Sequence, residues 1–240
     1  MQAGIDDRFP GFTPERAAQG EAMWAREGAR LRRLGIFPML AGTLSISSFV
    51  ALTLFFSGAG RACGVAADLL SVGVALALVM TAHALRILQS DRAPELGRRT
   101  TYFGMTAAIL LASSSTSVLL KDAALVVFPE PFPRTGPLGL SLIAVAMIGL
   151  WLLVAGCPGR SNWVISRALT WAGVLAGLLL IITSALFAAL GPQHPATAVV
   201  YFGAGALLPT WSIWLGVTML RGETGWRAAT ASLLSTKNSA

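Results

Sequence analysis

The sequence has few charged residues. Asp, Glu, Lys and Arg make up 12% of its 240 positions, and lysine occurs only twice, at Lys121 and Lys237. An ordinary soluble domain carries about 25% charged residues. With a mean hydropathy of +0.68, the chain is too apolar for that class. Its strong preference for arginine over lysine is typical of a GC-rich bacterial genome.

Histidine and cysteine are also scarce, and this limits the chemistry. The two histidines, His83 and His194, are expected near opposite membrane faces, about 25 Å apart. This placement argues against a haem held by two histidines of the chain, and no cofactor is predicted. Cys63 and Cys157 are expected on opposite sides of the membrane, too far apart for a disulfide. Zinc-site spacings and the G-x-S-x-G, H-E-x-x-H and phosphate-loop motifs are absent, so we expect neither a metal site nor an enzyme.

Apolar runs dominate what remains. About 20 apolar residues, at a rise of 1.5 Å per residue, cross a hydrocarbon core of about 30 Å. The sequence therefore predicts an all-α fold, a polytopic membrane protein with a six-helix bundle. It is flanked by an arm over residues 1–34 and a tail over residues 221–240. The expected spans are residues 35–58, 65–87, 102–128, 137–156, 168–190 and 198–220.

Basic residues alternate between the segments that connect these spans. Only Arg61, Lys121 and Arg134 fall on one side, and all the other Lys and Arg residues fall on the opposite side. Because excess positive charge stays cytoplasmic, both termini are predicted inside, in a bacterial plasma (inner) membrane. Anionic headgroups attract arginines beside the span ends. The net charge of +7 therefore indicates a lipid bilayer as partner, and no nucleic acid.

The arm contains a further helix signal. Thr13-Pro14-Glu15 has the features of a helix start: an N-cap hydroxyl, a proline at the first position and an acid in the first turn. A helix is predicted over residues 14–34, with Trp24 and Leu31 along one side. It either lies on the inner leaflet as an interfacial helix or docks a partner protein.

Besides Arg86, which flanks the inner end of its span, three charged residues fall inside the predicted spans, where an ionised group costs about 2.5–3.5 kcal/mol at the membrane centre. Asp68 lies one turn into the second span, and Lys121 and Asp122 lie about two turns below the outer end of the third. An Asp68–Lys121 pair between neighbouring helices is geometrically possible. These residues form either an outward-facing ion or proton site or a structural ion pair, unless the helix ends near Asp122 with its charges in water.

Hydroxyl side chains gather near the middle of three spans. Five consecutive hydroxyl residues in the third span cover every face of a helix that turns about 100° per residue, so several must face other helices. A proline in the sixth span frees a backbone carbonyl near mid-membrane. Such groups either line a polar site for a small substrate or serve as ordinary packing residues. The candidates are Ser47, Ser114, Ser115, Pro209 and Thr210.

Small and aromatic residues are the candidates for helix and partner contacts. Gly173 and Gly177, four positions apart, predict a close approach to a neighbouring helix or to another copy of the chain. Trp211 and Trp214 are three positions apart and form either a lipid-facing ridge or a partner contact, with a core role favoured over a cofactor role. The triplet Tyr-Phe-Gly occurs at Tyr102 and again at Tyr201, which raises the hypothesis of inverted repeats.

Two functional hypotheses follow. The leading one is a non-catalytic membrane protein that serves as an accessory or structural subunit of a complex, or forms a homo-oligomer, because no reactive constellation is present. The alternative is a transporter or channel for a small solute or ion that uses the midplane hydroxyls together with Asp68 and Lys121.

Overall fold

Every regular element in the computed structural model is a helix within the residues it describes, which are 28–89, 94–122, 136–162, 166–191 and 194–221. The prediction of an all-α polytopic membrane bundle is confirmed. The helices are α2 (Ile36–Phe56), α3 (Arg61–Gln89), α4 (Pro94–Asp122), α5 (Gly136–Asn162), α6 (Arg167–Leu190) and α7 (Pro195–Arg221).

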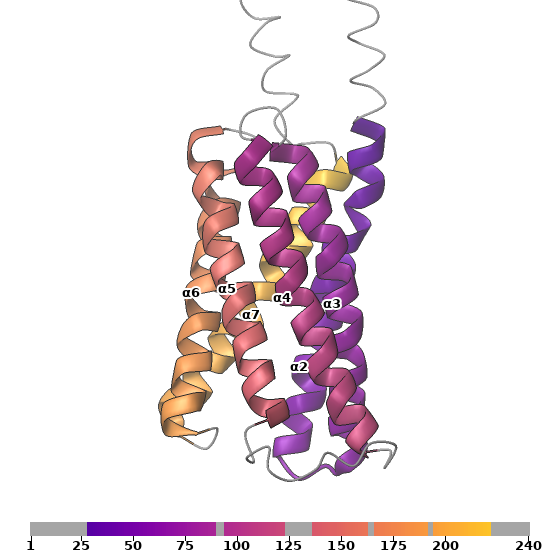
Figure 1. The fold of residues 1–240 in the computed structure, drawn as a ribbon, viewed down its shortest axis with the longest axis vertical. Coiled ribbons are helices and arrows are strands. Elements are labelled where there is room, and N and C mark those ends of the chain that lie inside the picture. Colours follow the sequence, from indigo (N-terminus) through magenta and orange to yellow (C-terminus); the bar gives the residue numbers. More distant parts are fainter. Residues whose placement is uncertain (1–27, 90–93, 123–135, 163–165, 192–193, 222–240) are drawn as a thin grey trace, which may run out of the picture.

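The helices run alternately up and down and form a closed ring (Figure 1). Each helix packs against the next one along the chain, and α2 packs against α7 to close the ring. The described chain therefore begins and ends at the same end of the bundle. We call this the inner end and the opposite one the outer end, following the predicted orientation, which stays a prediction.

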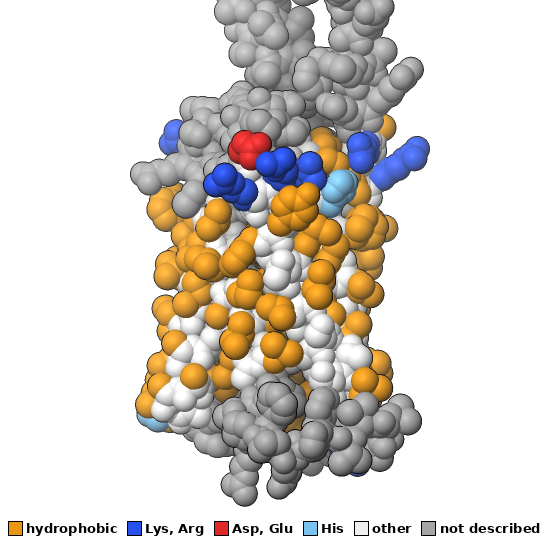
Figure 2. Space-filling model, viewed as in Figure 1, with side chains coloured by type: hydrophobic (Ala, Val, Ile, Leu, Met, Phe, Trp, Pro, Cys, Tyr) orange, Lys and Arg blue, Asp and Glu red, His pale blue; other side chains and the backbone are white. Residues whose placement is uncertain are grey.

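The sides of the bundle are apolar. Five helices, α2, α3, α4, α6 and α7, are long and apolar enough to cross a membrane, whereas the apolar part of α5 is the shorter stretch Gly139–Ala155. Hydrophobic side chains cover the side of the bundle in Figure 2, and Lys and Arg gather near the inner end. This distribution is that of an integral membrane protein. The exposed arginines at the inner end are Arg30, Arg32, Arg33, Arg86, Arg98, Arg99, Arg167 and Arg221.

Of the described helix boundaries, the start of α4 differs most from the predicted spans. Helix α4 begins at Pro94, eight residues before the expected start, because proline suits the first helical position and Arg98 pairs with Glu95 at 3.0 Å in the first turns. Apolarity alone does not reveal such a charged extension. Residues 123–128 of the expected third span lie outside the described residues.

The end of the predicted arm belongs to the bundle. Residues 28–34 are helical, and a turn at Gly35 leads into α2. Leu31 is only 9% exposed and belongs to the hydrophobic core, with Leu34 packed against that core. The rest of the predicted arm helix, residues 14–27 with Trp24, and the tail after Arg221 lie outside the described residues.

Hydroxyl groups link the first four helices of the ring. Between α2 and α3, the Ser48 hydroxyl donates to the Ala67 carbonyl at 3.1 Å and lies 3.0 Å from the Ser71 hydroxyl. Between α3 and α4, Thr101 donates to a carbonyl of α3 at 3.3 Å. Between α4 and α5, the Ser114 and Ser141 hydroxyls are hydrogen-bonded. Polar contacts of this kind hold helices together where lipid removes the usual hydrophobic driving force.

Glycines set the closest contacts elsewhere. Where α2 crosses α7, a Cβ atom on Gly42 would lie 2.8 Å from the Pro209 carbonyl oxygen, and one on Gly35 would lie 3.0 Å from the Gly216 carbonyl oxygen. Where α5 crosses α6, Gly149 and Gly177 face each other. Any larger residue at these positions would push the backbones apart, so these glycines are what allows the ring to close tightly.

Candidate functional site

Two buried tryptophans from helices that are not sequence neighbours meet in the interior of the ring. Trp151 of α5 and Trp211 of α7 meet edge to face, with ring centroids 6.4 Å apart. Each indole lies against a glycine: a Cβ atom on Gly104 of α4 would lie 2.5 Å from Nε1 of Trp151, and one on Gly173 of α6 would lie 2.7 Å from Nε1 of Trp211. The missing side chains of these glycines make room for the rings. Four helices thus converge on one aromatic pair.

The predicted midplane hydroxyls do not converge on one cavity. Ser47 and Thr210 are exposed, and each donates to a carbonyl of its own helix, Thr43 at 3.1 Å and Ala206 at 2.7 Å. This is the pattern of a hydroxyl on the lipid-facing side, where the only available acceptor is the preceding turn.

Three other members of that predicted set are buried but lie in different places. Ser114 and Ser115 are buried on α4, where Ser114 bonds to α5. Pro209 is buried on α7 beside Gly42 of α2. The five candidates therefore occupy two lipid-facing positions and two separate helix contacts.

The structure describes the side chain of only one of the three charged candidate residues. Asp68 is partly buried on α3 and has an interaction partner in the structure. Lys121 and Asp122 are the last two residues of α4, and their side chains lie outside the described residues. The contact between Thr101 and Ala82 sets the register of the two helices and places Asp68 about level with Ser115. Lys121 is then about 9 Å nearer the outer end, so the Asp68–Lys121 pair stays a prediction.

Four buried hydroxyl oxygens within the described residues have no hydrogen-bond partner, and all four belong to α6 and α7. A buried hydroxyl without a partner costs about 1–3 kcal/mol. By helical rise, Thr197 and Thr183 lie about 3 and 10 Å from the outer ends of their helices. Ser212 and Thr170 lie about 25 and 30 Å from those ends.

The residues predicted for partner contact fall into two groups. Leu31 and Trp211 lie in the core, and Gly173 and Gly177 lie at contacts within the bundle, so none of the four faces outward in this structure. Trp214, in contrast, is 40% exposed on the lipid-facing side of α7.

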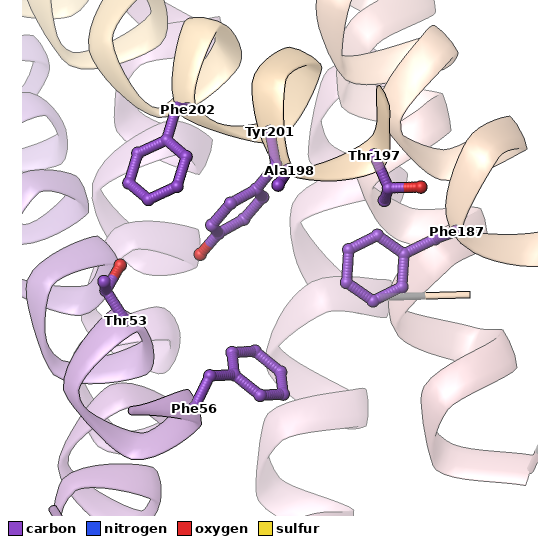
Figure 3. A pocket seen from close by; sticks show the side chains of 7 residues that line it. All are labelled: Thr53, Phe56, Phe187, Thr197, Ala198, Tyr201 and Phe202. Atoms are coloured by element: carbon purple, nitrogen blue, oxygen red, sulfur yellow. The ribbon is translucent and has the colours of Figure 1, made fainter. Parts of the chain in front are cut away.

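A pocket of about 120 Å³ lies between α2, α6 and α7. It is at the outer end, because Phe56 is the last residue of α2, Phe187 is near the end of α6 and Thr197 is near the start of α7. In Figure 3 the Tyr201 hydroxyl points to the side of Thr53, whereas the Thr197 hydroxyl is turned away from Tyr201. The remaining lining residues are Ala198 and Phe202.

Sequence reasoning did not find this pocket, although one signal was available. The Tyr201-Phe202-Gly203 triplet was noted only as a repeat. In the structure the ring of Tyr201 contacts aromatic rings of two other helices. Its centroid lies 4.9 Å from that of Phe49 of α2 and 6.4 Å from that of Phe187 of α6. Aromatic residues near the outer ends of three spans are the feature that could have pointed here.

Metal-binding and haem-binding groups are not brought together within the described residues. No group of three or more His, Cys, Asp or Glu side chains is found there. His83 lies on α3, six residues from its inner end, and His194 directly precedes α7 at the outer end. The Nδ1 atom of His194 accepts a hydrogen bond from the Ala196 amide at 3.2 Å. This bond ties His194 to the first turn of α7.

The fold and the apolar surface define the class of protein, an all-α integral membrane bundle. Comparisons with protein-family models, curated proteins and solved structures give no match. The function must therefore be argued from this chain's own geometry.

Proposed function

We propose that this chain is a non-catalytic integral membrane protein that works by assembling with other membrane polypeptides or with further copies of itself. The observation that carries the proposal is the buried tryptophan pair. Trp151 and Trp211 meet inside the ring, and each is seated on a glycine of a neighbouring helix. A pair of indoles at this position favours a scaffold over a solute route, because a carrier needs a polar site near the bilayer midplane.

The pattern of hydroxyl bonding supports the same proposal. Ser48, Thr101 and Ser114 link neighbouring helices, and Ser47 and Thr210 bond back to their own helices. Hydroxyl groups bonded in this way stabilise the bundle itself. The surfaces through which the protein acts are then the lipid-facing sides and the two ends.

The inner end is the proposed region of assembly. It carries the eight exposed arginines named above, whereas Arg61 lies at the outer end, and the described chain both begins and ends there. Because Leu31 is part of the core, a deletion that tests the arm must stop before Gly28. Removing residues 1–27 leaves the described bundle whole, and we expect this deletion to reduce the amount of partner polypeptide recovered with the protein.

The experiment is affinity purification of the tagged full-length chain from its own membrane in a mild detergent, followed by mass spectrometry of the recovered polypeptides. The 1–27 deletion is compared with Thr210→Val, a change on the lipid-facing side. Specific co-purification that the deletion weakens and Thr210→Val does not supports the proposal. Recovery of the chain as a monomer without partners overturns it.

A transporter is the second candidate, favoured by the four unpartnered hydroxyls along α6 and α7. They are spaced from near the outer end to near the inner end, as a polar track would be. This candidate predicts that liposomes containing the protein swell faster than empty ones in isotonic glycerol or urea. It also predicts that Thr183→Val slows the swelling while Thr210→Val does not. The assembly proposal predicts swelling no faster than that of empty liposomes.

A further inference from the structure

The pocket at the outer end has walls suited to one kind of ligand. Phe56, Phe187, Tyr201 and Phe202 supply four aromatic rings from three helices. Phe56 and Phe202 are each 50% exposed, so the pocket opens at the surface of the bundle. Flat apolar walls that open to one side accept a planar ring, which stacks or packs edge to face against them.

The volume of the pocket fits a ligand with a single ring. The pocket holds about 120 Å³. An engineered apolar cavity of about 150 Å³ binds benzene. A molecule of one six-membered ring therefore fills this space, whereas a fused polycyclic compound or a whole lipid headgroup exceeds it.

Within the part of the chain that the structure describes, two of the hydroxyls that line the pocket have no hydrogen-bond partner, those of Thr197 and Tyr201. Thr197 is fully buried and its hydroxyl is turned away from Tyr201 (Figure 3), which leaves Tyr201 as the hydroxyl available to a ligand. The Tyr201 hydroxyl points into the space beside Thr53, and the structure gives it no hydrogen-bond partner among the described residues. The Thr53 hydroxyl is already committed, because it donates to the Phe49 carbonyl at 2.8 Å. A half-buried phenol donor without an acceptor favours a ligand that brings an oxygen acceptor.

We propose that this pocket binds a small aromatic molecule that carries a hydroxyl or carbonyl oxygen. The ring packs between Phe56 and Phe187, and the ligand oxygen accepts a hydrogen bond from Tyr201. This site is separate from the assembly proposed above and stands or falls independently of it.

The test uses the full-length chain in lipid nanodiscs and a phenol that carries a photoreactive trifluoromethyl-diazirine. The control probe is the same diazirine on a benzene ring without the hydroxyl, and because this ring is more lipophilic the two probes are compared at equal concentration in the membrane. After illumination, labelled peptides are mapped by mass spectrometry, and labelling is repeated with excess unlabelled phenol. We expect phenol-competed labelling in the peptides that contain residues 53–56 and 197–202.

The chain offers a matched pair of variants, since Tyr102 and Tyr201 are its only tyrosines. Tyr201→Phe removes the pocket hydroxyl and keeps the ring. It should raise the phenol concentration for half-competition about three- to tenfold, the equivalent of one hydrogen bond. Tyr102→Phe, at an exposed position on α4, should leave it unchanged.

Three results overturn the proposal. The first is equal labelling of the pocket by both probes, which indicates an apolar space with no use for the hydroxyl. The second is labelling spread over the lipid-facing helix surfaces that excess phenol does not reduce. The third is competition that is the same in Tyr201→Phe and in the unmodified chain.

Discussion

Gly149 of α5 and Gly177 of α6 lie directly against each other where the two helices cross. A Cβ atom on Gly149 would lie 2.6 Å from the Gly177 carbonyl oxygen, and a Cβ atom on Gly177 would lie 2.5 Å from the Gly149 carbonyl oxygen. The contact is reciprocal, with each backbone resting on the other. This contact leaves no space for a methyl group on either glycine.

Gly149→Ala and Gly177→Ala should each destabilise the bundle. Added atoms in a close-packed contact typically cost about 1–3 kcal/mol, and here the obstacle is backbone, which cannot rotate away. The free energy of unfolding is measured by SDS titration in mixed micelles. Gly203→Ala is the matched control, since its Cβ would meet only the end of the Leu179 side chain, at 3.3 Å. Equal effects of all three changes would contradict the packing described here.

Replacing an interior tryptophan should lower the free energy of unfolding far more than replacing a surface tryptophan. Trp151 and Trp211 are 1% and 5% exposed, whereas Trp171 is 54% exposed. Replacing either buried indole by alanine should cost about 3–5 kcal/mol of unfolding free energy. Trp171→Ala should cost little. In the Trp151/Trp211 double-mutant cycle we expect a coupling of about 0.5–1.5 kcal/mol, and zero coupling would mean that the edge-to-face contact has no energetic weight.

Replacing a buried threonine by valine should raise the free energy of unfolding at one position and lower it at another. Thr183 has a buried hydroxyl without a partner, so Thr183→Val should stabilise the protein by about 1 kcal/mol. Thr101, also buried, donates to the Ala82 carbonyl of α3 at 3.3 Å, so Thr101→Val should cost about 0.6 kcal/mol. The same SDS titration measures both. A loss of stability in Thr183→Val would indicate that its hydroxyl has a bound partner in the membrane.

The predicted orientation can be checked with thiol chemistry. Cys63 is a free, partly buried cysteine on the first turn of α3 at the outer end, and Cys157 lies near the inner end of α5. A membrane-impermeant maleimide on intact cells should label Cys63 and leave Cys157 unlabelled. Labelling of Cys157 alone would reverse the orientation. The single variants Cys63→Ser and Cys157→Ser assign the signal.

The architecture could be predicted well from the sequence because it depends on strong, local signals. Long apolar runs mark the helices, and clustered arginines mark one end of the bundle. The close contacts at Gly173 and Gly177 also follow a local pattern, since small residues four positions apart form a smooth face on a helix. Each of these features can be read within one segment of the chain.

The direction in which side chains face could not be predicted, and the physical reason is the membrane. Lipid is as apolar as the protein core, so hydrophobicity does not separate the inside from the outside of a bundle. Trp211 and Trp214 therefore look alike in the sequence, yet the first is buried and the second is exposed. Ser47 and Ser48 are adjacent, but one bonds to its own helix and the other bridges to α3.

The outer pocket could be found only from the fold. Phe56, Phe187 and Tyr201 come from three separate helices. Only the closure of the ring between α2 and α7 brings them together. Nothing in the local sequence around any one of them indicates a binding site.

The most direct test of the central claim is native mass spectrometry of the protein released gently from its own membrane. The chain has a mass of 25.1 kDa. The assembly proposal predicts a particle whose mass is a multiple of this value or includes other polypeptides, and the identity of those polypeptides would then define the role. A single chain that carries only lipid, at every protein concentration tested, would contradict the proposal.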